Sequence, residues 1–370
     1  MRARHVTCLL DRPGVTGEPA MRPARQLREL SNALKASFDG SSVTHRVQDF
    51  EGWTNRVSHQ DSEGGYDHTQ TVKEYYDLCS EFMVLGWGES LHFAPLSPGE
   101  SLEDSKIRHQ QLMISKLELS PGMTVVDIGC GIGGPMRRVA REAGVRVVGV
   151  NISEVQCNNA KRLNAAAGLD DMTDCLVCSF MEMSAIADKT FDRGYAIEST
   201  CHAADKVVAF AEIYRVLKPG ALFWGQEMCM TDKFDPSDDR HRAIKRELMH
   251  GIALKEIATL REVNQALETA GFEVMEGLDL AGDQHGPITP WYQPMETRRG
   301  LLGGGFRRIP MGRKAVKRGS RMAEFLGVFP KGSSEVVELL DRTANAYVAG
   351  GRAGIFTPLY CFVARRPLRG

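Results

Sequence analysis

The sequence predicts an α/β fold with a doubly wound, seven-stranded, Rossmann-like sheet. Short β-rich runs alternate with stretches of helical periodicity from residue 124 to residue 280, which is typical of a parallel sheet covered by helices on both faces. The first of these runs leads into a glycine-rich loop and then into a helix-like segment. With 42% hydrophobic and 25% charged residues, the 370-residue chain can build a full soluble core.

The predicted elements follow from periodicity and from turn signals. Strands are expected at 124–128, 146–151, 175–180, 191–198, 221–228, 272–280 and 359–364. Helices are expected at 71–82, 105–117, 135–143, 153–167, 206–217, 260–270 and 334–347. Ser153 and Gln156 are spaced as a capping box at the start of one helix. The turn Lys218-Pro219-Gly220 ends the helix expected at 206–217.

Four regions are expected along the chain. Residues 1–65 are predicted to be mostly flexible, 66–118 to form a helical lid over a substrate region, and 119–281 to form the α/β core. Residues 282–370 interrupt the alternation, so we expect them to cap the carboxyl edge of the sheet and to add its final strand. The basic run 307–321 is interleaved with glycine and is predicted to be a solvated loop, with a membrane-surface contact as the second interpretation.

The glycine-rich loop indicates a cofactor with positive charge. Gly129, Gly131 and Gly134 match a dinucleotide-binding spacing, but Asp127 would repel a diphosphate. A carboxylate there suits a cofactor that carries an ammonium and a sulfonium and no phosphate. The pattern Asp127-x-Gly129-x-Gly131-x-Gly133 therefore favours S-adenosylmethionine. A glycine-rich turn that binds no ligand is the alternative.

Charge and cysteine content exclude several classes. The net charge of −1 argues against nucleic acid as a partner. Nine irregularly spaced cysteines argue against a disulfide framework and favour a reducing compartment, so the cytoplasm is expected. Cys175 and Cys178 lack a second pair, so no metal is expected. No run reaches transmembrane length and no secretory signal is evident, whereas a transit peptide stays open.

Polar side chains follow several predicted strands at the edge where an open α/β sheet binds ligands. Asn151 ends the second strand and is expected to bond a ribose hydroxyl, with a turn role as the alternative. Gln156 could reach the same ribose or only close its capping box. Glu198 and His202 leave the fourth strand, and Asp232 leaves the next. Aromatic residues could line a pocket or only pack, and these are Trp87, Phe93, Trp291 and Tyr292.

Seven segments in order resemble the sterol C-24 methyltransferases from about residue 70 onward. They are YYD (75–77), GWGESLHF (86–93), VDIGCGIGGP (126–135), YAIESTCH (195–202), EIYRVLKPG (212–220), CMTDKFD (229–235) and GIFTP (354–358). The resemblance implies transfer of a methyl group from S-adenosylmethionine to the Δ24 double bond of a sterol side chain. A carbocation, a hydride shift and a proton loss follow. It also implies a methyltransferase core with a C-terminal sterol-methyltransferase cap.

The resemblance also assigns site residues. The cofactor is expected on Tyr76, Asp127, Gly129, Cys130, Gly131, Gly133, Asn151, Gln156, Ser179 and Phe180. The reacting end is expected to involve Trp87, His92, Glu198, His202 and Asp232, with Glu198 and His202 as the two candidate bases. A hydrophobic substrate implies a peripheral contact with a sterol-bearing membrane such as the endoplasmic reticulum. A homo-oligomer is compatible with all of this.

Three departures from the family pattern lie near the expected site. Met83-Val84-Leu85 replaces an aromatic–acid–aromatic run, Ser179 replaces an acid that bonds the adenine amino group, and Gln226 and Met228 flank Glu227 where aromatics are common. These departures keep two other hypotheses open. One is a methyltransferase acting at another sterol position or on another isoprenoid, and the other is a non-catalytic sterol-binding homologue. A nicotinamide dehydrogenase is disfavoured by Asp127 and Asn151.

Overall fold

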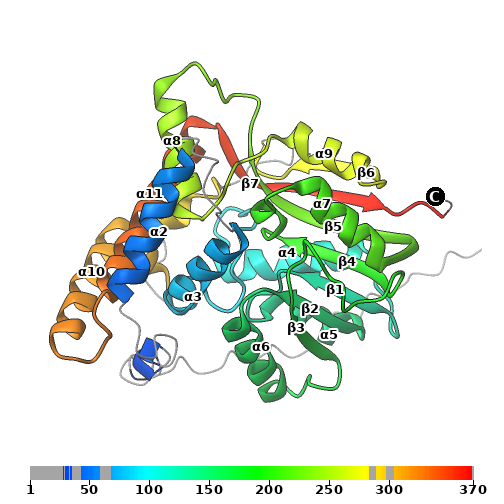
Figure 1. Cartoon of the computed structure of the whole chain (residues 1–370), viewed down its shortest axis with the longest axis horizontal. Coiled ribbons are helices and arrows are strands. Elements are labelled where there is room, and N and C mark those ends of the chain that lie inside the picture. The colour runs from blue at the N-terminus through cyan, green and yellow to red at the C-terminus, as the bar shows by residue number, and fades with distance from the viewer. Residues whose placement is uncertain are drawn as a thin grey trace, which may run out of the picture.

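The computed structural model describes residues 28, 30–32, 34–35, 43–58, 68–282, 289–296 and 304–368. An α/β core occupies one side of the molecule, and a group of helices packs at its other side (Figure 1). Most of segment 1–65, predicted to be flexible, lies outside the described residues. Its described part includes helix α2 (Val43–Ser58), which the sequence patterns did not predict. Within the described part of the chain, no helix is long and apolar enough to cross a bilayer.

The sheet has seven strands in the order β3-β2-β1-β4-β5-β7-β6. The strands are β1 (Thr124–Ile128), β2 (Arg146–Asn151), β3 (Thr173–Val177), β4 (Phe191–Ile197), β5 (Leu217–Met230), β6 (Glu273–Asp279) and β7 (Phe356–Arg365). The first five pair in parallel, and β7 runs antiparallel between β5 and β6. The predicted doubly wound α/β class is therefore confirmed. The third strand ends before Ser179 and Phe180, three residues earlier than predicted.

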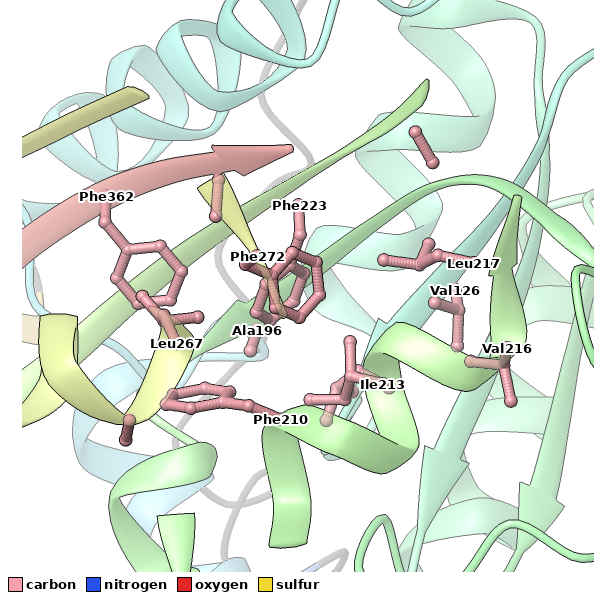
Figure 2. Close-up of a cluster of buried hydrophobic side chains, with 14 of the residues drawn as sticks. Val126, Ala196, Phe210, Ile213, Val216, Leu217, Phe223, Leu267, Phe272 and Phe362 are labelled. Carbon is pink, nitrogen blue, oxygen red and sulfur yellow. The ribbon is translucent and has the colours of Figure 1, made fainter. Parts of the chain in front are cut away.

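Helices cover both faces of the sheet because successive strand residues point to opposite sides. One face carries α7 (Lys206–Val216) and α9 (Leu260–Thr269), which meet Val126, Phe223 and Phe362. Figure 2 shows Phe210 and Ile213 of α7 against these strand side chains. The other face carries α4 (Leu102–Lys116), α5 (Gly134–Ala143) and α6 (Glu154–Ala166) over the adjacent strand positions, such as Val125 and Trp224.

A helical layer adjoins the carboxyl edge of the sheet. It consists of α2, α3 (His68–Trp87), α8 (Asp239–Gly251), α10 (Pro310–Phe325) and α11 (Ser333–Ala353), which contact one another (Figure 1). The prediction of a solvated loop at 307–321 is wrong, because residues 310–325 form α10. The helix has Pro310 in its first turn, where the fixed φ of proline is favourable, and its glycines do not interrupt it.

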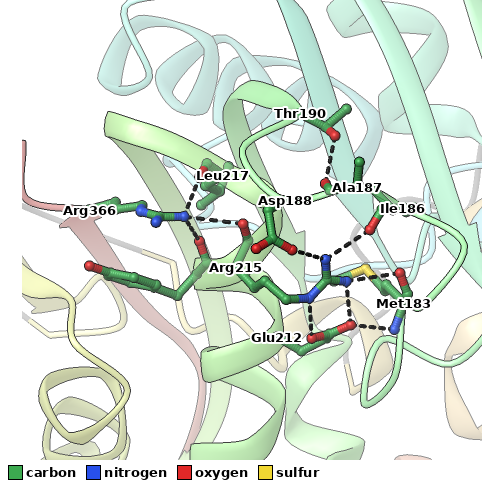
Figure 3. A network of polar contacts seen from close by, with 10 residues as sticks. Met183, Ile186, Ala187, Asp188, Thr190, Glu212, Arg215, Leu217 and Arg366 are labelled. Carbon is green, nitrogen blue, oxygen red and sulfur yellow. Dashed lines mark hydrogen bonds and ion pairs between the residues drawn. The ribbon is translucent and has the colours of Figure 1, made fainter. Parts of the chain in front are cut away.

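Two arginines join α7 to its surroundings (Figure 3). Arg215 is paired with Glu212 at 2.7 Å and with Asp188 at 2.6 Å, and it also donates to the carbonyls of Met183 and Ile186. Arg366 donates to the carbonyls of residues 214, 215 and 217, where α7 leaves its last acceptors unpaired. The loop after β3 and the end of the chain are therefore both attached to one helix terminus.

We expect Phe210→Ala to lower the free energy of unfolding by about 3–5 kcal/mol, because it removes a fully buried ring that contacts Phe223 and Phe362. Val208→Ala is the matched control on the same helix, since Val208 is 46% exposed, and it should change stability by less than about 0.5 kcal/mol. Urea unfolding followed by circular dichroism measures both. Equal losses for the two variants would contradict this assignment of the core.

Candidate active site

Two cavities meet at the carboxyl edge of the sheet. A smaller one, of about 90 Å³, is lined by the glycine-rich loop after β1 and by the ends of β2 and β4. A larger one, of about 210 Å³, is lined mainly by apolar side chains of α3, α10 and α11. Five residues line both cavities, namely Tyr76, Leu91, His92, Glu198 and His202. The two cavities are therefore adjacent, and these five side chains form the wall that they share.

Glycines in the loop allow the backbone to turn and a ligand to approach. Positive φ angles of 74°, 54° and 77° occur at Gly129, Gly131 and Gly133. A Cβ at Gly129 would overlap the side chain of Ser199, whereas a Cβ at Gly131 would meet no atom within 4 Å. Gly131 thus faces open space in the smaller cavity, as expected of a loop that cradles a ligand.

Asp127 lies at the end of β1 and lines the smaller cavity. Its carboxylate accepts a hydrogen bond of 2.8 Å from the Tyr195 hydroxyl, and no Lys or Arg pairs with it within the described residues. Burial raises the pKa of Asp127 to about 7, and the Tyr195 hydrogen bond lowers it only in part. An ammonium group in this cavity would supply the missing positive partner, whereas a diphosphate would add repulsion.

Asn151 and Gln156 also line the smaller cavity, and Asn151 donates to the carbonyl of Gly131 in the glycine-rich loop at 3.3 Å. Asn151 donates to the Gln156 side-chain oxygen at 2.8 Å, and the Gln156 amide donates to Ser80 of α3 at 2.6 Å. Ser153 caps α6 through the backbone N–H of Gln156, as predicted, but the Gln156 side chain does not complete a capping box. It points into the cavity wall instead, and this arrangement holds α3 over the site.

The other predicted cofactor residues divide into two groups. Cys130 and Phe180 line the smaller cavity, where an aromatic ring and a thiol offer apolar contacts to a heterocycle. Ser179 does not line it, and its hydroxyl accepts from the backbone N–H of Met181. The sulfur of Cys130 lies 3.4 Å from the sulfur of Cys175. The side chain of Cys175 therefore points toward the glycine-rich loop rather than toward Cys178.

Glu198 is the buried acid of the shared wall. It follows β4 with a φ of +52°, a left-handed conformation that is uncommon for a residue with a side chain. One carboxylate oxygen accepts from the backbone N–H of Phe93 at 2.6 Å and from the Gln226 amide at 2.7 Å. Burial raises the pKa of Glu198 well above its usual value, and the Phe93 hydrogen bond opposes this shift.

Gln226 fixes the direction of the Glu198 side chain. Its amide nitrogen also donates to the carbonyls of Phe93 and Pro358, and its oxygen lies 2.7 Å from Nε2 of His109 on α4. All four groups are buried. An aromatic residue at this position could not form these bonds, so the departure from the family pattern at Gln226 has a structural role.

His202 lies at the end of the same loop as Glu198 but differs from it in chemistry. Its Nε2 is 2.8 Å from the Tyr76 hydroxyl, and its carbonyl is 3.0 Å from Nε2 of His68. Burial lowers the pKa of His202 to about 3, and the neighbouring His68 adds to the shift. The imidazole is therefore neutral at ordinary pH, and its Nε2 is engaged by Tyr76.

His92 has both ring nitrogens bonded. Nδ1 lies 2.7 Å from the Phe93 carbonyl, so it carries the proton, and Nε2 accepts from the Gln110 amide at 2.8 Å. Burial lowers the pKa of His92 to about 3. The structure places this predicted site residue on the shared wall, where it orients the loop 86–93 and has no nitrogen left to take up a proton.

Aromatic faces surround the larger cavity near Glu198. Trp87, Phe93 and Tyr347 line it, with ring centroids 5.4 Å apart for Trp87 and Phe93 and 5.1 Å apart for Phe93 and Tyr347. Met83 and Leu85 line it as well, so the departure at 83–85 does change the wall of this cavity. Trp291 packs behind Phe93 and Tyr347 and lines neither cavity, which favours the packing role over the pocket role.

Asp232 is not brought to the site. It is exposed at the end of β5 and lines neither cavity, so the structure does not support its predicted place at the reacting end. The buried acid of that strand is Glu227, which pairs with Lys206 at 3.0 Å and accepts from Thr200.

Sequence reasoning missed Tyr347 and the positioning role of Gln226 and His109. Tyr347 lies on a helix 149 residues after Glu198, and only the fold brings the two together. The sequence showed Gln226 as a departure from the family pattern. It did not show that Gln226 would bond a residue of α4 and the loop at Phe93. In the described part of the chain, no cluster of side chains has the make-up of a metal site.

Comparison with known proteins agrees with this geometry. Residues 65–301 match the family model described as mycolic acid cyclopropane synthetase, and residues 304–368 match that of the sterol methyltransferase C-terminal region. The solved cyclopropane synthase MmaA2 of Mycobacterium tuberculosis shares the fold, with a TM-score of 0.62 at 20% identity, and the match covers 82% of this chain and 100% of that one. A solved sarcosine dimethylglycine methyltransferase of Galdieria sulphuraria gives 0.61 at 22%, covering 80% and 99%.

Curated relatives are much more similar in sequence. Cycloartenol-C-24-methyltransferase of Arabidopsis thaliana is 40% identical over 92% of this chain and 99% of its own length. Sterol 24-C-methyltransferase of Saccharomyces cerevisiae is 36% identical over 90% and 88%. The predicted resemblance is confirmed, and the chain belongs to the sterol C-24 methyltransferases, a family of enzymes that use S-adenosylmethionine.

Proposed function

We propose that this chain transfers a methyl group from S-adenosylmethionine to C24 of a Δ24 sterol side chain. The observation that carries the proposal is the shared wall, where a cavity that fits a cationic cofactor lies directly against an apolar cavity. The names of the curated relatives support the same substrate class. A peripheral contact with a sterol-bearing membrane belongs to the proposal because such a substrate is delivered from lipid.

The residues of the smaller cavity fit the cofactor. Asp127 would hold its ammonium, the backbone at Gly129 and Gly131 would lie against it, and Asn151 would bond a ribose hydroxyl. Bound there, S-adenosylmethionine supplies an electrophilic methyl group. The role of Ser179 in binding adenine is not part of the proposal, because that residue lies outside the cavity wall, whereas Phe180 offers a ring.

The chain then has to stabilise a carbocation and keep water away from it. The alkene π electrons would form the new bond to the methyl carbon as the bond between that carbon and the sulfonium sulfur breaks, which leaves a neutral thioether and puts the positive charge on C25 of the side chain. A hydride shift from C24 to C25 would then move that charge to C24. Trp87, Phe93 and Tyr347 offer π faces worth roughly 0.5–2 kcal/mol each to a desolvated cation. Their packing also excludes water that would otherwise trap the cation.

Glu198 is the base that this geometry favours for the final proton loss. Both ring nitrogens of His92 are bonded, and the pKa of His202 is lowered to about 3 while its Nε2 is engaged by Tyr76. Glu198 keeps one carboxylate oxygen on Phe93 and Gln226 and has the other for the substrate. A neighbouring cation favours the ionised carboxylate and so offsets the effect of burial.

The proposed activity is tested with labelled S-adenosylmethionine and a panel of Δ24 sterols, each compared with its saturated side-chain analogue. We expect label transfer only to sterols with the Δ24 bond. Transfer to an isoprenoid or at another sterol position would replace the proposal by the second candidate, for which Met83 and Leu85 in the cavity wall are the supporting observation. Cofactor binding without any transfer would indicate a non-catalytic sterol-binding protein.

Glu198→Gln is expected to lower kcat by about 10²–10⁴, since it removes a base while it keeps the side-chain volume and the bond from Phe93. The affinity for S-adenosylmethionine, measured by calorimetry, should stay within about twofold. His202→Gln is the comparison, and it should reduce kcat much less if Tyr76 only positions that ring. Wild-type turnover in the Glu198 variant would remove this residue from the mechanism.

The affinity for S-adenosylmethionine is expected to weaken as the pH falls through about 7. Asp127 has a pKa of about 7 in the free protein, and a cationic ligand favours its ionised form, so binding below that pH must release a proton. Below pH 7 the Kd should therefore rise by up to about tenfold for each unit by which the pH falls.

Asp127→Asn should bind more weakly and show a flat profile from pH 5.5 to 7.5, while Glu198→Gln keeps the wild-type slope. A wild-type slope in the Asp127 variant would show that another group titrates.

A further inference from the structure

Positive charge is concentrated in one short part of this chain. The whole sequence has 46 basic and 47 acidic residues, yet residues 307–331 contain eight Lys or Arg and a single acid, Glu324. That acid is bound to Ser334 at the start of α11. The segment includes α10 and the turn that joins it to α11.

One face of α10 is exposed along its full length and combines large apolar side chains with cations. Met322 is 60% exposed, Phe325 86%, and Leu326, which follows the helix, 64%. Lys314 and Arg318 lie on the same face, because positions 311, 314, 318, 322 and 325 recur at helical spacing. Neither Lys314 nor Arg318 pairs with an acid within the described part of the chain.

The opposite face of α10 belongs to the larger cavity. Arg313 and Val316 line that cavity, and Arg313 is paired with Asp341 of α11. Figure 1 places α10 at the outer edge of the helical layer, away from β6 and the rest of the sheet. The helix therefore separates the apolar cavity from the surroundings of the protein.

We infer that the exposed face of α10 and its following turn, residues Met311 to Leu326, form a docking surface for an anionic lipid bilayer. Phe325, Met322 and Leu326 would enter the interface, and Lys314 and Arg318 would contact lipid phosphates with their stems along the apolar surface. The inference rests on the proposed function in one respect. A sterol substrate is the reason for such a surface, because docking brings the larger cavity to the lipid that contains the substrate.

Charge complementarity favours a bilayer over a second copy of this chain. Two identical basic faces would repel each other, whereas an anionic leaflet attracts each Lys or Arg near its surface. Isolated apolar side chains are common on protein surfaces, but here they lie next to one another at the end of a basic helix.

The test is co-sedimentation of the full chain with vesicles of phosphatidylcholine alone or with added phosphatidylserine. We expect binding that increases with the anionic lipid and weakens at high salt. Met322→Ser/Phe325→Ser should lower partitioning by about tenfold or more. Lys314→Gln/Arg318→Gln should lower it by about tenfold or more on anionic vesicles only.

Met275→Ser is the matched control, because Met275 is 50% exposed on β6, and it should bind vesicles as the wild type does. Methylation of detergent-solubilised sterol should be unchanged in all three variants, which separates this inference from the proposed activity. The inference is overturned if the wild type does not bind vesicles, or if the Met322/Phe325 variant binds them equally well. It is also overturned if that variant instead dissociates a dimer in the absence of lipid.

Discussion

The arrangement of this site depends on holding one acid, Glu198, almost fully buried in the wall between two cavities. A buried carboxylate is unfavourable unless its oxygens are bonded, and here the backbone N–H of Phe93 and the amide of Gln226 bond one of them. Reaching that place requires the chain to leave β4 in a left-handed conformation. The interactions around Glu198 therefore have to stabilise a backbone geometry that the residue itself disfavours.

Ser199 connects this requirement to the cofactor loop. Its hydroxyl donates to the carbonyl of Ile128 at the end of β1, and its side chain occupies the space that a Cβ at Gly129 would need. The loop that would hold the methyl donor and the loop that carries the base are thus packed against each other. A change at Gly129 would therefore disturb both loops at once.

The core and the loop after β1 were predictable from local sequence, because their signals lie within about ten residues. Asp127 with its glycines, and the alternation that continues to residue 280, need no distant partner to be recognised. The contacts of the reacting end could not be predicted in this way. Gln226 meets His109 and Phe93 across more than 110 residues, and Asp232 resembled a site residue until the direction of β5 was known.

The α10 helix illustrates the other failure of local patterns. Glycines within 307–321 lower helix propensity, and closely spaced cations repel one another, so the run suggested a loop. Contacts with α11 override both effects. One face of the helix is fixed by Val316 and by the ion pair of buried Arg313 with half-buried Asp341.

The helical layer also determines which side chains form the wall that we propose to stabilise the cation. Where the family pattern places aromatic residues at 83–85, this chain has Met83 and Leu85, which offer apolar volume but no π surface. Phe93 and Tyr347 face the cavity beside Glu198, and Trp291 packs edge to face against both. Phe356 packs behind Tyr347 in a tilted arrangement. The C-terminal region therefore contributes Tyr347 to the cavity wall beside Glu198, where we propose that the reaction occurs. A methyltransferase core without α11 would keep its cofactor loop together with Trp87 and Phe93, but it would lose Tyr347 from the aromatic wall beside Glu198.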